Sequence, residues 1–560
     1  MKKILFSLFL LFSFTYGAAA QDKYTDGVFV INEGWFGHCN STINYLDGTG
    51  TWVYDVIEKE NPGIQLGSTT SIGTIYGDRF YIITKQDKDG GSDKDGARIT
   101  ICDAKTMKVI KQIKDINNEG TRADGRGFVA VNNTKAYIGS NNGIYILDLE
   151  DLEIKGRIEG TENEHTDPYG KVYLGQTGSL LRINEKVYAL HQDKGLMVID
   201  PETDKVTNVV SGPDEGELTY GSAVLAKDGS LWLSVSDRYG RGDVYGYIMR
   251  YTPSTGDTLR VNIPEGINPP SNSWFAWTPD GFCASTKNNV LYWNTGDLAW
   301  YSNNKICKYD IDKNEMSQFI DFESEGLKIY GSSMRVDPVS DNLYVTLFKD
   351  TSIPYFTLRK YDNTGTMLNE YEMMQDYWFP SIPVFPDNEA PVAQNTPETN
   401  ISDSKALTIN LDNIATDADN MNAAMVKTIT EITDNSVITA AITNGNLNVT
   451  PLKDGNSTVV LNINSNGKST TAHIAFNVTG YNGIDNASAN IRTAYVKDGI
   501  LYVNNCNEYV FTIYDMSGKS VDSFTVATDN FTRNINVPDG ICIIKGRHAD
   551  NKVMFKLNIR

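Results

Sequence analysis

The strongest constraint on the fold is a short pattern that the chain repeats seven times. Each copy is an alternating strand that ends in a polar turn and continues into a second strand, as in NYLDGTGTW and ICDAKTMKV. The turns lie 45 to 58 residues apart, at Asp47, Asp103, Asp148, Asp200, Thr252, Asp310 and Asp362. Asp, Thr, Pro and Gly suit tight turns, and an Asp side chain can accept hydrogen bonds from its own turn. Seven units of this length predict a seven-bladed β-propeller.

The two ends of the repeat predict how the ring closes. The first unit begins at VFVIN, which corresponds to the second strand of a blade, so its innermost strand is missing. The last unit is followed by YWFPSIPVFPD, a strand without a blade of its own. We therefore expect this strand to complete the first blade, because that pairing removes two exposed sheet edges. The predicted propeller covers residues 26–387.

The same segments carry a family resemblance. The opening VFVINEG, the Asp turns and the closing FPSIPVFPD resemble the YncE-like, DUF5074-type surface β-propellers of Bacteroidetes, over about 360 residues. Some members of that group bind corrinoids such as vitamin B12 and pass them to an outer-membrane transporter, whereas others have no known ligand. The resemblance implies a surface protein that binds a small molecule, with cobalamin as one expected ligand and a transporter as an expected partner.

The N-terminus and the charge of the chain predict where the protein works. Residues 1–20 contain two lysines, then an apolar run, then three alanines, which predicts a secretory signal peptide. No later apolar run approaches the roughly 18 residues of a transmembrane helix. The formal net charge of −20 argues against nucleic acid as a partner, because nucleic acid needs a basic face. We expect an exported protein, extracellular or associated with the outer membrane.

Two further domains are expected after the propeller. Residues 388–399 are rich in Pro, Asn and Thr and predict a linker. Residues 400–480 contain short alternating strands in the pattern of an Ig- or cadherin-like β-sandwich. Residues 485–560 resemble the C-terminal sorting domain of type IX secretion, except at Cys542, where that family usually has an aromatic residue. The predicted fold is all-β, a seven-bladed propeller followed by two small β-sandwiches.

Aromatic residues concentrate in the loops of one predicted propeller face. Loops normally carry Gly, Asn, Asp, Ser and Pro, yet GWFGHCN places a Trp-Phe pair in the first of them. We expect an aromatic, ligand-binding mouth around the channel that consists of Trp35, Phe36, Tyr169, Tyr239, Tyr245, Trp274, Trp300, Tyr330, Tyr355 and Trp378. The alternative is that these rings pack loops onto blades, because a buried aromatic contributes roughly 1.5–3 kcal/mol without any ligand.

Metal and catalytic signals are weaker. The segment DKDGGSDKDG offers Asp87, Asp89, Asp93 and Asp95 as calcium ligands, but it lacks the EF-hand spacing and the closing Glu, so a solvated loop is the alternative. His38 and His191 have no evident catalytic partners in the sequence. No Ser-His-Asp order and no phosphate-binding loop stands out, and we assign no catalytic residue.

Three classes of function remain open at this stage. The preferred one is non-catalytic capture of a ligand such as cobalamin, whose broad macrocycle can stack on aromatic rings. The second is a surface scaffold or adhesin, which the extra sandwich domain favours. The third is an enzyme acting on polysaccharide, for which the mouth offers the carboxylates Glu33, Asp167, Asp243 and Asp376. The fold does not choose among these classes.

Overall fold

The protein is all-β, as its sequence predicts. The structure is a computed structural model that describes residues 22–117, 123–165, 174–213, 216, 218–237, 245–270, 281–295, 302–350, 353–394, 396–481, 492–537, 540–549 and 551–559. In these ranges the chain forms strands and turns, with one short α-helix, α1 (Val56–Glu60), and none of its helices is long and apolar enough to cross a membrane. The predicted signal peptide lies outside the described residues.

Between residues 27 and 384, the described chain forms seven four-stranded antiparallel sheets. Three of them follow chain order and consist of β4 (Ser68–Tyr76), β5 (Arg79–Gln86), β6 (Ile99–Asp103) and β7 (Val109–Ile113); β8 (Gly125–Asn132), β9 (Lys135–Ser140), β10 (Gly143–Asp148) and β11 (Glu153–Arg157); and β12 (Thr177–Ile183), β13 (Lys186–His191), β14 (Gly195–Asp200) and β15 (Lys205–Val210).

The next three sheets repeat this plan with small additions. They consist of β16 (Leu218–Leu225), β17 (Leu231–Asp237), β18 (Tyr247–Tyr251) and β19 (Thr258–Asn262); β20 (Phe282–Ala284), β21 (Val290–Thr295), β23 (Lys305–Asp310) and β24 (Glu315–Asp321); and β26 (Met334–Val336), β27 (Leu343–Asp350), β28 (Ile353–Tyr361) and β29 (Met367–Met373). The additions are a two-stranded sheet of β22 (Ser302–Asn303) and β25 (Ile329–Tyr330), and the 3₁₀ turn η1 (Glu323–Glu325).

The remaining sheet joins the two ends of this part of the chain. It contains β1 (Gly27–Asn32), β2 (Thr42–Asp47) and β3 (Trp52–Val53), and its innermost strand is β30 (Pro380–Val384). β30 runs antiparallel to β1, with Phe29 opposite Val384 and Ile31 opposite Ile382. The expected closing strand is therefore confirmed.

The innermost strands of the sheets touch one another in a closed cycle. Contacts run from β4 to β8, β12, β16, β20, β26 and β30, and from β30 back to β4. Serines link successive strands: Ser71 Oγ donates to the carbonyl of Gly125 at 2.8 Å, and Ser179 Oγ accepts from the amide of Ala223 at 3.2 Å. Ser332 Oγ likewise donates to a carbonyl of β30, at 3.3 Å. This cyclic packing of four-stranded sheets is propeller-like.

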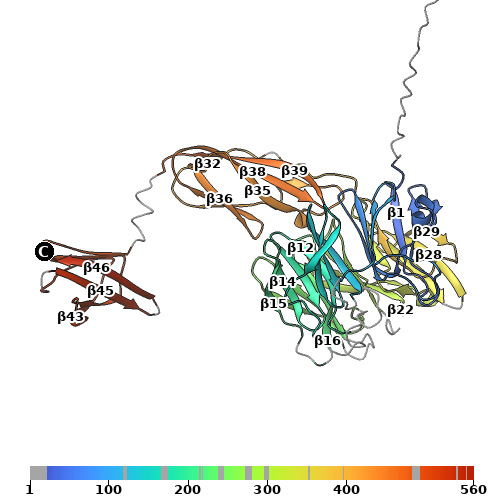
Figure 1. The fold of residues 1–560 in the computed structure, drawn as a ribbon, viewed down its shortest axis with the longest axis horizontal. Helices are drawn as coiled ribbons and strands as arrows, with labels where there is room; N and C mark the ends of the chain where they lie inside the picture. The colour runs from blue at the N-terminus through green and yellow to red at the C-terminus, as the bar shows by residue number, and fades with distance from the viewer. Residues whose placement is uncertain are drawn as a thin grey trace, which may run out of the picture.

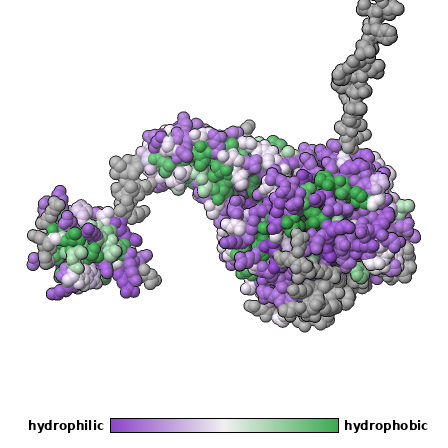
Figure 2. Space-filling view, viewed as in Figure 1, coloured by the Kyte–Doolittle hydropathy of each residue, from purple (hydrophilic) through white to green (hydrophobic). Residues whose placement is uncertain are grey.

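The core of this unit lies between neighbouring sheets. Phe29, Tyr45, Phe80 and Ile382 come from different strands, and each is at most 1% exposed within one apolar cluster. Burying side chains of this size contributes roughly 1.5–3 kcal/mol each. Polar residues cover most of the visible surface of this unit, apart from one hydrophobic band (Figure 2). Apolar side chains packed between the faces of neighbouring sheets therefore hold the sheets together.

The repeated Asp residues stabilise their turns in the expected way. Asp47 Oδ1 accepts hydrogen bonds from the amides of Thr49 (3.0 Å) and Thr51 (2.9 Å), and Asp362 makes the same two bonds in the last sheet, each 2.9 Å long. The Thr49 hydroxyl and these amides hold the pKa of the Asp47 carboxyl below its usual value. The Asp side chain thus replaces a backbone acceptor at the tips of these two hairpins.

A second unit follows, coloured orange in Figure 1. Its sheets consist of β32 (Thr399–Ile401), β39 (Lys468–Val478), β38 (Gly455–Ser465) and β35 (Val426–Ile432), and of β33 (Leu407–Asn410), β37 (Asn446–Pro451) and β36 (Ile438–Thr443). A short pair, β31 (Val392–Ala393) with β34 (Ala415–Thr416), and the 3₁₀ turn η2 (Asn422–Ala424) complete it. Part of the expected linker is thus ordered, because β31 pairs with β34 and the amides of residues 388 and 389 donate to Asp419.

This second unit covers the turns at one end of the sheets. The amide of Gly77, in the β4–β5 turn, donates to the carbonyl of Asn466 at 2.8 Å, and the Asn466 side chain donates back to the carbonyl of Ile75 at 2.9 Å. Lys287, in the β20–β21 turn, donates to the carbonyl of Ala418 at 3.1 Å. Because strands alternate in direction, the loop that contains Trp35 lies at the opposite end.

The C-terminal unit consists of two further sheets. One contains β40 (Thr493–Lys497), β41 (Ile500–Asn504) and β44 (Asn530–Asn534), and the other contains β43 (Ser520–Thr525), β42 (Val510–Tyr514), β45 (Gly540–His548) and β46 (Asn551–Ile559). Cys542 lies 2% exposed in the core of this unit, beside Phe511 and Ile544. All six cysteines of the chain are free thiols.

Candidate functional site

The Trp-Phe loop lies where the two ends of the ring meet. After β1 the backbone continues to pair with the segment before β30: the amide of Glu33 donates to the carbonyl of Phe379 at 2.9 Å, and that of Gly34 to the carbonyl of Trp378 at 3.2 Å. As a result, Trp35 and Trp378, remote in sequence, lie with ring centroids 4.4 Å apart. Two of the predicted mouth residues are therefore in contact.

The rings of this pair differ in exposure. Trp378 is half-buried and packs edge-on against Phe356, with centroids 5.5 Å apart. Trp35 is 37% exposed and also lies against the ring of His38, at 4.0 Å, while Phe36 is 63% exposed. Trp35, Phe36, His38 and Trp378 thus form a small aromatic platform that Trp378 anchors. Trp35 and Phe36 present their apolar surface to the solvent.

The aromatic surface continues along the outside of the first sheet. Tyr377 stacks on Tyr54 with centroids 4.9 Å apart and planes 8° apart, and Tyr54 stacks in turn near Trp52, at 5.9 Å. Sequence reasoning missed Tyr54. The available signal was the alternation of aromatic residues in TWVYD, directly after the Asp47 turn. A second group of rings, Trp52, Tyr54 and Tyr377, therefore ends one residue along the chain from Trp378.

Asp89 holds the platform loop in place. It is fully buried, and its Oδ2 accepts from the amide of Gly37 at 2.9 Å and from Ser68 Oγ at 3.1 Å. Its own amide donates to Asn40 Oδ1 at 2.8 Å. Gly91 lies so close that a Cβ there would come within 2.3 Å of the carbonyl of Gly37. The loop is therefore positioned before any ligand arrives.

The other acidic residues of this segment make ion pairs or face solvent. Asp95 lies 3.4 Å from both Lys88 and Lys114, which together hold the pKa of its carboxyl below the usual value. Asp87 lies 3.9 Å from Arg98, and Asp93 is exposed. Nowhere in the described ranges do three His, Cys, Asp or Glu side chains gather as a metal would require. Calcium binding at this segment stays a prediction.

The remaining predicted mouth residues do not form one ring among the described residues. Tyr245 is 55% exposed and donates to the carbonyls of Pro264 and Ile267. Tyr330 is 8% exposed and packs on Phe379, and Tyr355 is half-buried with Lys349 Nζ 4.9 Å from its ring. Four predicted mouth residues lie outside the described residues: Tyr169, Tyr239, Trp274 and Trp300.

The carboxylates and the histidine considered for catalysis differ in their exposure to solvent. Glu33 is 5% exposed, Asp376 is exposed, and Asp167 and Asp243 lie outside the described residues. His191 is 2% exposed, and its Nδ1 accepts from two backbone amides at 3.2 Å each. Burial, and next the charge of Lys194, lower the pKa of His191 to about 4.

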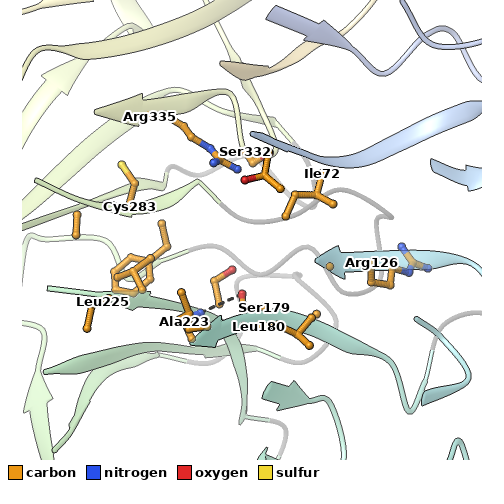
Figure 3. Close-up of a pocket in the computed structure, with 18 of the residues that line it drawn as sticks. Ile72, Arg126, Ser179, Leu180, Ala223, Leu225, Cys283, Ser332 and Arg335 are labelled. Carbon is orange, nitrogen blue, oxygen red and sulfur yellow. Dashed lines mark hydrogen bonds between the residues drawn. The ribbon is translucent and has the colours of Figure 1, made fainter. Parts of the chain in front are cut away.

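A second feature, not expected from the sequence, lies inside the ring of sheets. The innermost strands enclose a cavity of about 470 Å³, and Met421 and Ala424 of the second unit close one end of it. Its walls include Arg126, Arg182 and Arg335. Figure 3 shows Arg126 and Arg335 on different sides of the cavity. The sequence signal for this cavity is a set of small residues that interrupt the strand pattern, as in TGS and YGS. At these interruptions the pairing of β4, β12 and β16 with their neighbours shifts register.

The comparison with protein families shows which family the chain belongs to. The model of the family described as "Domain of unknown function (DUF5074)" matches residues 26–386. This chain belongs to the DUF5074 family. The DUF5074 match begins just before β1 and ends just after β30, so it spans the whole closed cycle of sheets.

Solved structures share parts of this arrangement. A quinoprotein alcohol dehydrogenase-like protein of Bacteroides thetaiotaomicron is 21% identical, with a TM-score of 0.46, and the match covers 65% of this chain and 79% of that one. The extracellular domain of a protein of the same organism, described as a hybrid two-component system, is 14% identical, with a TM-score of 0.38, 81% of this chain covered and 60% of that one. The search of curated proteins finds no match.

Proposed function

We propose that this DUF5074 protein is an exported, non-catalytic binding protein, a seven-bladed propeller that captures a flat ligand at its aromatic mouth. The observation that carries the proposal is the Trp35–Trp378 contact, beside which Trp35 and Phe36 are exposed on a loop that hydrogen-bonds to Asp89. Exposed apolar surface on an ordered loop typically marks a binding site. A preorganised loop also loses little entropy when the ligand arrives.

The ligand class that fits best is a corrinoid such as cobalamin. Its broad, amide-fringed macrocycle can lie on aromatic rings, and the resemblance to surface propellers that bind corrinoids points the same way. Each ring that stacks on such a ligand contributes on the order of 1 kcal/mol. Several rings together support at least micromolar affinity after the cost of association. Delivery to an outer-membrane transporter, with the second and C-terminal units as an Ig-like spacer and a sorting domain, completes the proposal.

Substitution of Trp35 tests the mouth. Purified protein is titrated with cyanocobalamin while its tryptophan fluorescence is recorded. We expect saturable quenching in the natural protein and about tenfold weaker binding for Trp35→Ala, because one stacked ring contributes about 1 kcal/mol or more. Tyr495→Ala, which removes an exposed ring from the C-terminal unit, is the matched control and should bind normally. The melting temperature of Trp35→Ala should change little, since Trp35 is 37% exposed and belongs to none of the buried apolar clusters of the described residues.

Two results would contradict the proposal in different ways. Unaltered binding with a melting temperature many degrees lower would mean that Trp35 only packs the loop. Turnover of a polysaccharide that Trp35→Ala abolishes would support an enzyme instead. The visible spectrum of bound cobalamin should stay that of free cobalamin, with no bond between cobalt and the protein, because the His38 ring packs against Trp35. A spectral shift that depends on His38 would contradict only the expected absence of a cobalt–protein bond.

A further inference from the structure

The capped cavity inside the ring is cationic, although the chain as a whole is acidic. Its described lining contains the three arginines Arg126, Arg182 and Arg335 and no Asp, Glu, His or Lys. The formal net charge of the chain is −20. A wall that carries charge of one sign, opposite to that of the rest of the protein, concentrates ions of the opposite sign. The charge distribution therefore singles out this cavity as a site for an anion.

Arg335 is the clearest element of this wall. It lies on β26 and points towards Ser332, another residue of the cavity wall (Figure 3). Throughout the described ranges, no carboxylate forms an ion pair with it and no hydrogen bond of its guanidinium occurs. Burial lowers the pKa of Arg335, and only the nearby thiol of Cys283 acts in the other direction. A buried charge without a partner is destabilising, so a protein keeps one mainly where a ligand supplies the partner.

Arg182 repeats the pattern on the neighbouring part of the wall. Its Nε donates to the carbonyl of Asn184 at 2.7 Å, whereas its Nη1 is buried and has no hydrogen-bond acceptor among the described residues. Burial lowers its pKa as well, with partial compensation from the carboxylates of Glu185 and Glu202. Arg182 therefore adds a second guanidinium, with one unsatisfied donor, to the residues that line the cavity.

The surroundings of Arg126 contain charged groups of both signs. Its guanidinium is close enough to Lys85 to lower the pKa of that amine, which is fully buried. The acidic groups on this side are Glu33 and Asp124, which act on Lys85, and Asp124 also pairs with Arg98 at 2.7 Å. These carboxylates lie behind the wall and do not line the cavity.

The rest of the wall defines the size and polarity of an occupant. Apolar side chains line much of the cavity, namely Leu180, Leu225, Phe282, Met334 and Met421. The volume of about 470 Å³ lies within the range of small-molecule sites, roughly 300–1,000 Å³. Guanidinium groups bind carboxylate and phosphate oxygens through paired hydrogen bonds. We propose that this cavity binds a small organic anion, an oxyanion group on a compact apolar body, with Arg335 and Arg182 as its ligands.

The test uses the full chain and two probes, citrate and inorganic phosphate, at constant ionic strength. Calorimetry and thermal melting are measured for the natural protein and for Arg335→Met and Arg182→Met. We expect saturable binding and a rise in melting temperature for the natural protein, and at least tenfold weaker binding for each variant. The two probes separate carboxylate from phosphate recognition. Arg260→Met, which removes an arginine stacked on Tyr247 at 3.9 Å on the outer strand β19, should behave as the natural protein.

A second readout does not depend on the choice of anion. Without added anion, Arg335→Met should melt no lower than the natural protein, because an apolar side chain of similar length removes an uncompensated buried charge. A clear loss of stability with unchanged anion binding would mean that Arg335 is structural and would overturn the proposal. Equal stabilisation of all variants would show an adventitious ion only, and no saturable effect of either probe up to about 10 mM would also overturn it. Trp35→Ala should leave anion binding intact, which separates this site from the aromatic mouth.

Discussion

Single residues in this protein gain their roles from partners far away in sequence. Asp89 belongs to an acidic segment that favours calcium binding when read alone, yet its carboxylate is used to hold Gly37 and Ser68. His191 is similar: its ring lies in the protein interior with Nδ1 facing two backbone amides. In both cases burial and backbone partners decide the chemistry of a titratable side chain.

His191 predicts how stability depends on pH. Its pKa is about 4 in the folded protein, against 6.5 for an ordinary histidine, and Asp193, Glu164, Lys194 and His165 are the charged groups around it. The unfolded chain binds the proton more readily than the folded protein. The contribution of neutral His191 to the free energy of unfolding is therefore complete above pH 6.5 and is lost as the pH falls from 6.5 to 4. The loss amounts to about 3 kcal/mol.

Chemical denaturation between pH 7 and pH 4 measures this contribution. His191→Gln should flatten the decline in unfolding free energy over that interval, while His473→Gln, on an exposed position of β39, should keep it. An equal decline in both variants would show that other groups cause the acid sensitivity.

At the scale of secondary structure, β30 is the element on which the ring depends. It pairs with β1, contacts β4 and β26, and receives the hydrogen bond of Ser332. Without it, β1 and β26 would each lose an inner neighbour, and the apolar cluster around Phe29 and Ile382 would open to water. One strand of five residues therefore closes a unit of more than 350.

Shortened chains test the closing strand. A chain that ends at residue 394 keeps β30, and we expect it to unfold cooperatively and to resist proteolysis. A chain that ends at residue 376 lacks β30 and should lose cooperative unfolding, because large apolar faces are left open. Circular dichroism during thermal melting distinguishes the two. Full stability of the shorter chain would contradict the role of β30.

At the scale of the whole molecule, the second unit caps the channel of the first. Asp387, at the junction, accepts hydrogen bonds from the side chains of Asn466, Lys468 and Asn420. Met421 and Ala423 pack against the core formed by the β12 and β16 sheets. The unit that the sequence predicts as a separate β-sandwich thus contributes Met421 and Ala424 to the lining of the central cavity.

Loss of Asp387 should loosen this cap. Asp387→Ala leaves Lys468, a mostly buried cation, without its carboxylate. This loss weakens the free energy of contact between the two units by about 3 kcal/mol. Hydrogen exchange at the amide of Gly77, which donates to Asn466, should then become faster. Asp403→Ala removes an exposed carboxylate of the same unit and serves as the control. Unchanged protection of Gly77 in Asp387→Ala would mean that other contacts hold the cap.

The sequence alone predicts the all-β class, the repeated Asp turns and the closing strand, because these follow from local rules. Strand alternation, turn chemistry and the need to pair sheet edges act over a few residues or over one repeat. The aromatic platform was predicted in part: Trp35 and Trp378 were both named, while Tyr54, directly after β3, was missed because its stacking partner Tyr377 is remote in sequence.

Only the tertiary structure decides what these elements enclose. Whether Asp89 binds a metal or a backbone amide, and whether three arginines share one cavity, depends on distances between residues of different sheets. Pattern and turn chemistry contain no such distances, because they describe neighbours along the chain. The sequence therefore determines the repeating unit and the way its ends join, and the closed ring of sheets with its cap determines which charges face one another and which face the central cavity.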